Sequence, residues 1–147
     1  MAQFKVCIGD PKAKKSIQKE VSGDAAAPFL GLKIGDKFNG ELLDLTGYEF
    51  EITGGSDIAG FPMRKDAQGT GLRKILAIKG IGISNKKKYR SKKKKGLRTM
   101  KGMRQRKTVA ANTIFDRTAQ INAKVVKYGS VPLIVEAKEA PAEAKKE

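Results

Sequence analysis

The residues of this chain best suited to chemistry are lysines and arginines that crowd one short stretch. Eight of the ten residues from 86 to 95 are basic. More arginines and lysines follow up to residue 107, spaced by glycines and by small or apolar residues. Cationic groups at this density repel one another, and nucleic-acid phosphates relieve the repulsion while releasing counterions. The run therefore predicts binding to a polyanion.

Within this basic region, lysine and arginine are suited to different contacts. Lysine supplies a diffuse point charge, whereas arginine can hold a phosphate through two hydrogen bonds. We therefore expect Arg98, Arg104 and Arg106 to make the geometrically defined contacts. Tyr89 can stack on an exposed base or pack locally, and the sequence leaves both readings open. The predicted RNA-binding residues are Arg64, Lys65, Arg73, Lys74, Lys86, Lys87, Lys88, Tyr89, Arg90, Lys92, Lys93, Lys94, Lys95, Arg98, Lys101, Arg104, Arg106 and Lys107.

The whole net charge of the chain, +16, belongs to one segment. No acidic residue occurs between Asp66 and Asp116, and this window of 49 residues contains 16 lysines and arginines. The other 98 residues carry 15 basic and 15 acidic side chains, which cancel. The sequence thus describes an electrically neutral body that carries a polycation, and such a charge implies a polyanionic partner. Charge alone does not separate RNA from DNA, but no DNA-recognition helix, zinc finger or heptad pattern is present.

Several function classes lack the residues they need. The chain has no histidine and a single cysteine, Cys7, so we expect no metal site, no disulfide, no cofactor and no enzymatic activity. A metal-dependent nuclease would have to use Asp57 and Asp66, which precede the basic region, and two carboxylates are few for holding catalytic metals. No apolar stretch reaches the ~18 residues of a membrane span, and no signal peptide is visible. We therefore expect no membrane partner, no small-molecule substrate, and a cytoplasmic setting.

The elements that must position the basic region read as short strands separated by turns. Alternating apolar residues over 4–8 and a second run over 16–21 predict a hairpin, and residues 48–53 predict a half-buried strand. Further strands are expected over 37–40, 42–45, 72–79, 108–109, 113–115 and 119–128. The strand at 72–79 is expected in a central position of the sheet. A weak helical signal is present near 24–31. The predicted fold class is mainly β, a small barrel-like or sandwich-like antiparallel domain.

The expected organisation is one β-rich domain over residues 1–135, with a long basic loop at 84–107. The last twelve residues, 136–147, are nearly all alanine, glutamate, lysine and proline. Such a composition cannot bury enough apolar surface to offset the cost of ordering, so this segment is predicted to be a disordered, solvated tail.

A short motif connects the sequence to a known family. Residues 52–57 read Ile-Thr-Gly-Gly-Ser-Asp and residues 60–64 read Gly-Phe-Pro-Met-Arg. This combination is similar to the hallmark of the small-subunit ribosomal protein S-six family of archaeal and eukaryotic type. The match extends through 73–78, 104–109 and 121–129, so the resemblance covers about residues 2–130. The chain resembles the short archaeal form, because its C-terminus lacks the serine cluster of eukaryotic members.

The resemblance implies a structural constituent of the small ribosomal subunit, located in the cytoplasm within the ribosome. Its implied partners are small-subunit ribosomal RNA and neighbouring ribosomal proteins. The alternative that the residues leave open is a free nucleic-acid condensing or chromatin-like protein.

The hallmark itself is expected to play a structural part. We expect Gly54, Gly55 and Gly60 to permit a turn with positive φ, and Asp57 to accept hydrogen bonds from turn amides. Phe61 and Met63 are expected to fill the core.

Overall fold

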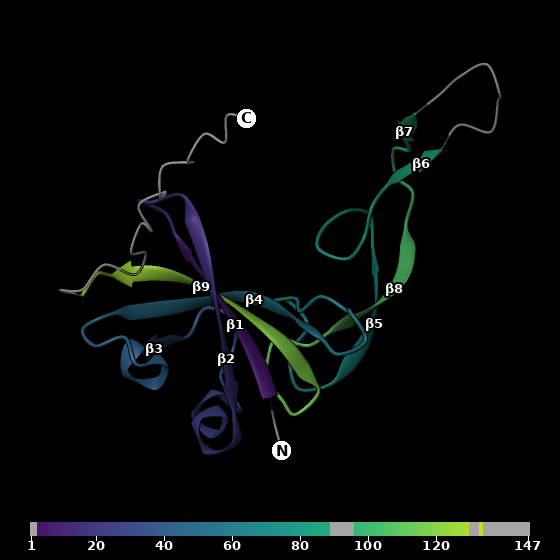
Figure 1. The fold of residues 1–147 in the computed structure, drawn as a ribbon. Helices are drawn as coiled ribbons and strands as arrows, with labels where there is room; N and C mark the ends of the chain where they lie inside the picture. The colour runs from purple at the N-terminus through teal and green to yellow at the C-terminus, as the bar shows by residue number, and fades with distance from the viewer. Residues whose placement is uncertain (1–2, 89–95, 130–132, 134–147) are drawn as a thin grey trace, which may run out of the picture.

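The computed structural model describes residues 3–88, 96–129 and 133, and consists mainly of strands (Figure 1). Five strands form one sheet in the order β2-β1-β9-β4-β3, and two further pairs, β5–β8 and β6–β7, form separate two-stranded ribbons. The strands are β1 (Gln3–Asp10), β2 (Lys15–Ser22), β3 (Lys37–Asn39), β4 (Glu49–Asp57), β5 (Leu72–Ala77), β6 (Lys86–Lys88), β7 (Leu97–Thr99), β8 (Gln105–Ala110) and β9 (Thr118–Lys127). The mainly β fold class is confirmed.

The large sheet is mixed rather than purely antiparallel. β1 and β2 form the predicted hairpin, and β4 pairs antiparallel with both β3 and β9. The exception to antiparallel pairing is at the centre of the sheet, where β1 runs parallel to β9 and Lys5 is paired with Gln120. Alternation within one strand carries no information about the direction of its neighbour, so the sequence could not reveal this parallel pair.

One face of the large sheet supplies the core of the body. Phe4 and Ile8 of β1, Phe50 of β4 and Ile121 of β9 are fully buried, in keeping with the alternation of these strands. A 3₁₀ helix, η1 (Gly23–Phe29), closes over this face and inserts Phe29, whose ring lies edge-on to Phe38 with 5.1 Å between centroids. The weak helical signal near 24–31 thus corresponds to a 3₁₀ helix.

The described sheet is open. β2 and β3 are its edges, and no pairing joins them in the part of the chain that the structure describes. A second 3₁₀ helix, η2 (Gly40–Leu43), approaches β2, and the ammonium of Lys19 donates to the carbonyl of Leu43 at 2.5 Å. Of the two predicted shapes, the sandwich-like one is compatible with this arrangement, and a closed barrel is not formed. Residues 42–45, expected as a strand, begin in η2.

The remaining strands build an arm that projects from the body (Figure 1). β5 and β8 pair over six residues each, and β6 and β7 form a second ribbon beyond them. The expectation that 72–79 forms a central strand is wrong, because β5 pairs with β8 alone. The expected basic loop over 84–107 contains β6, β7 and the start of β8, so in the described residues it is largely a hairpin.

One smaller expectation also differs from the structure, and another is not tested by it. Residues 113–115 form only an isolated bridge, between Thr113 and Lys33. The predicted solvated tail, 136–147, lies outside the described residues.

Candidate nucleic-acid-binding arm

The hallmark motif builds a tight reversal at the end of β4. The amide of Asp57 donates to the carbonyl of Phe61 at 2.9 Å, and the amide of Gly60 donates to the carbonyl of Asp57 at 2.8 Å. Gly60 has φ of 80°, as expected for a turn glycine. One carboxylate oxygen of Asp57 accepts from the amide of Ile58 at 2.7 Å, in agreement with its predicted turn role. The chain therefore folds back beside β4.

Gly54 and Gly55 have a different role from the predicted one. Both lie inside β4, and neither has positive φ, so the expectation of a turn at these positions is wrong. A β-carbon on Gly55 would lie 2.4 Å from the carbonyl oxygen of Gln120 in β9 and 2.9 Å from the sulfur of Met63. Gly55 is needed because β9 and the returning segment approach it from two directions. A β-carbon on Gly54 would meet nothing within 4 Å.

The returning segment joins the body to the arm. The amide of Met63 donates to the carbonyl of Gly55 at 2.9 Å, which ties the segment to β4. On its other side, the amide of Ala110 in β8 donates to the carbonyl of Pro62 at 2.9 Å, and the amide of Arg64 donates to the carbonyl of Ala110 at 3.1 Å. Met63 is buried as predicted, whereas Phe61 is only half-buried. The hallmark thus fixes the root of the arm.

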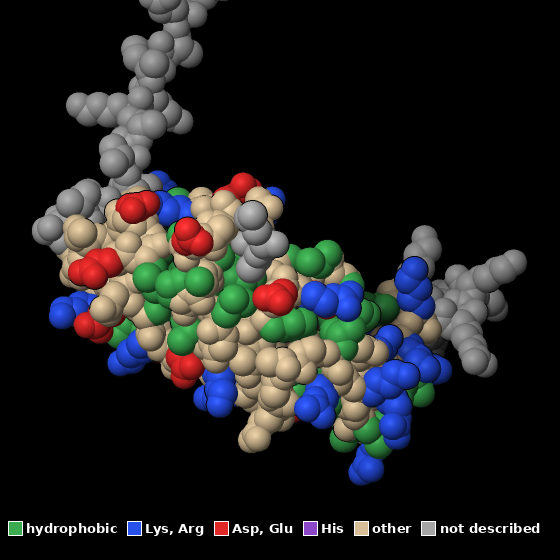
Figure 2. Space-filling model, turned by 90° about the horizontal axis from the view of Figure 1, so that it is seen from below, with side chains coloured by type: hydrophobic (Ala, Val, Ile, Leu, Met, Phe, Trp, Pro, Cys, Tyr) green, Lys and Arg blue, Asp and Glu red, His purple; other side chains and the backbone are tan. Residues whose placement is uncertain are grey.

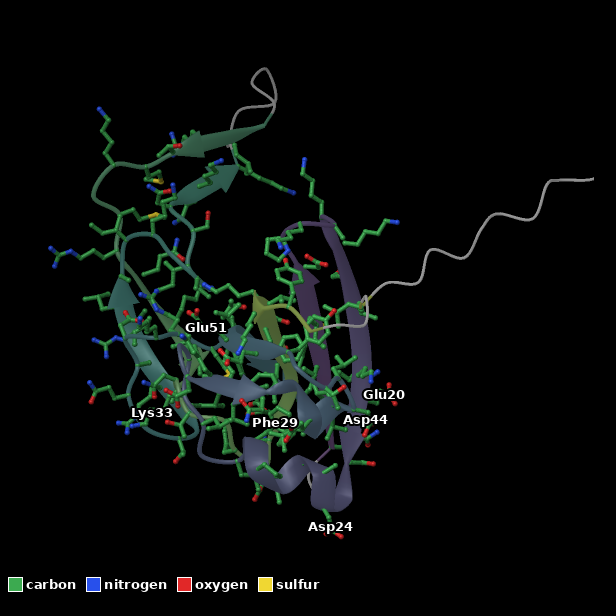
Figure 3. The ribbon with its side chains drawn as sticks, turned by 90° about the vertical axis from the view of Figure 1, so that its left-hand side faces the viewer. Glu20, Asp24, Phe29, Lys33, Asp44 and Glu51 are labelled. Carbon is green, nitrogen blue, oxygen red and sulfur yellow. The ribbon has the colours of Figure 1, made fainter. Side chains whose placement is uncertain are left out.

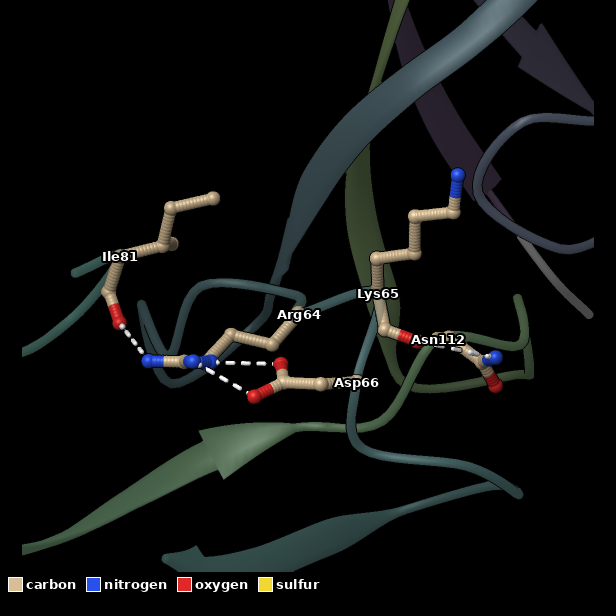
Figure 4. A network of polar contacts seen from close by, with 5 residues as sticks. All are labelled: Arg64, Lys65, Asp66, Ile81 and Asn112. Atoms are coloured by element: carbon tan, nitrogen blue, oxygen red, sulfur yellow. Dashed lines mark hydrogen bonds and ion pairs between the residues drawn. The ribbon is translucent and has the colours of Figure 1, made fainter. Parts of the chain in front are cut away.

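Arg64 stabilises this joint through its side chain (Figure 4). Its guanidinium donates to both carboxylate oxygens of Asp66, at 2.8 and 2.6 Å, and to the carbonyl of Ile81 at 3.3 Å. The hydrogen bonds from Arg64 hold the pKa of Asp66 below its usual value, and the bond to Asp66 raises the pKa of Arg64. The side chain of Arg64 is only 15% exposed, whereas neighbouring Lys65 is exposed.

We expect Asp66→Asn to lower the melting temperature by about 1–4 °C at pH 7, because an exposed ion pair contributes little. The pKa of Asp66 is lowered in the folded state, so its contribution is present above its ordinary value of 3.8 and disappears as the pH falls through the lowered value. Thermal unfolding of both proteins between pH 7 and pH 2 checks this. The melting temperatures should converge at the acidic end, and Asp116→Asn, at an exposed position, serves as the control. A difference that persists at the lowest pH would contradict the role of the carboxylate.

The first ribbon of the arm carries four of the predicted residues. Arg73 and Lys74 lie on β5, and Arg106 and Lys107 lie on β8. All four side chains are exposed, and Arg104 lies exposed just before β8. The arm thus falls within the stretch of sequence that has no acidic residue. These cations therefore have no carboxylate partner from that stretch.

The second ribbon holds four more of the predicted cations. Lys86, Lys87 and Lys88 make up β6, and Arg98 is the central residue of β7. Lys87 and Arg98 face each other directly across the ribbon, and like charges in that arrangement destabilise a strand pair. Every residue of both strands is exposed. An anion bound between Lys87 and Arg98 would remove this repulsion.

Of the remaining predicted residues, one lies outside the two ribbons and the others lie outside the described range. Lys101 is exposed in the turn that follows β7. The predicted residues that fall outside the described range are Tyr89, Arg90, Lys92, Lys93, Lys94 and Lys95. Our prediction omitted Lys79, which is exposed between β5 and β6 and could have been found from its place in the acid-free window. It also omitted the lysines of the β1–β2 turn, where Lys12 lies 4.0 Å from the ring centroid of Tyr128.

The charges divide the molecule into two ends. Lysine and arginine side chains gather at the end that bears the arm, and most of the acidic side chains visible in this view lie over the rest of the body (Figure 2). Glu20, Asp24 and Asp44 lie on the side of η1 and β2, away from β6 and β7 (Figure 3). A polyanion is therefore attracted more strongly to the arm than to the rest of the protein.

Other kinds of site have little support. In the described residues, no three aspartate, glutamate or cysteine side chains group so that they could hold a metal ion. The two carboxylates that a nuclease would need are otherwise engaged, since Asp57 is 2% exposed and Asp66 is bound by Arg64. None of the described helices has the length and apolar character that crossing a membrane requires.

The fold and the arm define a small, mostly β protein whose cations are concentrated on a projecting ribbon. Comparison with known proteins gives the particular family: the model of the family described as Ribosomal protein S6e matches residues 4–136, and the chain belongs to this family. It is similar to proteins named "Small ribosomal subunit protein eS6" from three archaea. Identity is 42% with the Thermoplasma acidophilum protein, covering 86% of this chain and 90% of that one. It is 42% with the Archaeoglobus fulgidus protein (89% and 92% covered) and 41% with that of Methanococcus maripaludis (88% and 92%).

Proposed function

We propose that this chain is a structural, non-catalytic component of the small ribosomal subunit and that it binds ribosomal RNA through its arm. The observation that carries the proposal is the concentration of cations on that arm. Described cations of β5, β6, β7 and β8 are exposed, and no acidic residue occurs between Asp66 and Asp116. Phosphates supply the missing counter-charge. The family and the names of the archaeal relatives support the ribosomal setting, and a cytoplasmic location as part of the particle belongs to the proposal.

The predicted contact residues fall into two groups under this proposal. Lysines and arginines of β5 to β8 meet phosphates directly, and Arg98, Arg104 and Arg106 provide the bidentate contacts. Tyr89 and the basic residues up to Lys95 extend the contact beyond β6. Arg64 belongs to a different group, because its guanidinium is already bound by Asp66 and Ile81. We assign to Arg64 the role of positioning the arm, and to Lys65, next to it, the role of contacting a phosphate.

Neighbouring ribosomal proteins are the second class of proposed partner. The acidic end of the body, with Glu20, Asp24 and Asp44, is unsuited to RNA and lies away from the arm (Figure 3). It is available to basic segments of other proteins in the particle.

Binding of the purified chain to small-subunit ribosomal RNA tests the proposal. The affinity should fall steeply with salt, by about 10³–10⁵ between 50 and 200 mM if 6–10 phosphates are contacted. Sedimentation of a tagged chain from cell extract should place it with small ribosomal subunits. A chain that binds duplex DNA equally well and sediments away from ribosomal subunits would instead be the nucleic-acid condensing protein that the composition also allows.

A further inference from the structure

The four cations of the β5–β8 ribbon are divided equally between its two faces. Side chains alternate along each strand, and the register pairs Lys74 with Thr108 and Ile75 with Lys107. Lys74 and Arg106 therefore share one face, and Arg73 and Lys107 share the other. Each strand contributes one cation to each face.

On both faces the two cations are diagonal neighbours. Lys74 is opposite Thr108, two residues from Arg106, and Arg73 is opposite Val109, two residues from Lys107. Diagonal neighbours in an antiparallel pair are about 7–8 Å apart, so each face has its own pair of repelling charges. None of the four forms an ion pair within the described residues, and their surroundings in the sequence are free of acidic side chains.

Apolar side chains beside these cations are also left open to solvent. Leu72 and Leu76 lie on the face of Lys74 and are 42% and 55% exposed. On the other face, Ile75 is half-buried beside exposed Arg73 and Lys107. A ribbon that rested on a single surface would have its cations on one side and would leave the opposite side neutral. This ribbon instead has one exposed pair of cations on each side, although the exposed leucines lie on one side only and Val109, on the other, is buried.

We propose that the β5–β8 ribbon is held between two separate stretches of RNA phosphate backbone, one against each face, so that the arm bridges two RNA segments. The proposal rests on the RNA-binding function proposed above and adds the geometry of binding. RNA is the occupant that the charges favour, because each face needs a partner with closely spaced anions and phosphates repeat along a strand. The exposed leucines then pack against the sugars of one strand.

Two double variants of the full chain separate the faces. Lys74→Gln with Arg106→Gln neutralises one face, and Arg73→Gln with Lys107→Gln neutralises the other. Each pair should weaken binding to purified small-subunit ribosomal RNA and reduce the slope of log affinity against log salt by about 1.4–1.8, the value for two phosphate contacts. The quadruple variant should lose about the sum. If one double variant keeps the wild-type affinity and slope, only one face binds and the bridge is wrong.

Crosslinking reports the same geometry without removing a charge. A photoreactive phenylalanine at Leu76 samples one face, and the same residue at Gln105 samples the other. In assembled subunits the two positions should crosslink to RNA segments that are not adjacent in the RNA secondary structure. Crosslinks to one shared segment, or a crosslink from either face to a protein, would overturn the bridge. A wild-type chain that fails to bind ribosomal RNA at all would instead contradict the proposed function.

Discussion

Replacing residues 86–99 with the two-residue turn Asn-Gly is expected to lower the affinity for small-subunit ribosomal RNA by about 10²–10³-fold at 100 mM salt. The replaced segment contains nine of the 16 cations of the acid-free window. The amide of Met100 donates to the carbonyl of Asn85 at 2.9 Å, so these two residues are already a pair that a short turn can join. The salt slope should shrink by about 2–3, the value expected if about three or four of the nine cations meet a phosphate.

The body should be unaffected by this replacement. Among the described residues, none of the buried core falls between 86 and 99, so thermal unfolding of the shortened protein should match that of the wild type. A variant in which serine or threonine replaces the nine lysines and arginines of this segment is the matched control, because it keeps the length of the segment and removes only its charge. Both variants should bind equally weakly. If either keeps the wild-type salt slope, the binding site lies elsewhere on the chain.

The largest expected effect on stability comes from a single methyl group in the hallmark. We expect Gly55→Ala to destabilise the protein by about 2–3 kcal/mol, because the added carbon overlaps the backbone of β9 and the sulfur of Met63. Relief of the overlap requires β4 to move away from β9, the central strand of the sheet. Urea unfolding followed by circular dichroism measures the change.

Gly54→Ala is the matched control for this substitution, one residue away in the same strand. Its β-carbon would meet nothing within 4 Å, so the free energy of unfolding should change by less than about 0.5 kcal/mol. A similar loss at both positions would mean that a turn-like backbone, rather than close approach of neighbouring strands, accounts for the glycine pair.

The sequence correctly predicted those features that depend only on residues close together in the chain. The alternation of Phe4, Val6 and Ile8 correctly predicted β1, and the pattern around Phe50 and Ile52 correctly predicted a strand with one buried face. The absence of acidic residues between Asp66 and Asp116 correctly marked where positive charge would be concentrated. These features are local, so a linear pattern is enough to reveal them.

Expectations failed where the outcome depends on a distant partner. Gly55 was taken for a turn residue because glycine usually marks a turn, but the contacts that require it come from Gln120 and Met63. Residues 72–79 have apolar side chains on both faces, which favoured a central strand, yet β5 belongs to a projecting ribbon and leaves Leu76 55% exposed. The basic run predicted a loop, since charge repulsion within an isolated chain gives no reason for β6 and β7 to pair.

The position of β9 in the sheet has a consequence for how the protein is made. A ribosome delivers the chain from its N-terminus, so the β1–β2 hairpin and the β3–β4 pair emerge as two separate pieces whose facing edges lack a neighbour. The strand that fills the gap is the last of the nine described strands to be synthesised, and it joins Lys5 to Gln120 across most of the chain length. The cationic arm therefore leaves the exit tunnel before the body that supports it can close, and each nascent molecule passes through a stage at which its charge is accessible and its fold is incomplete.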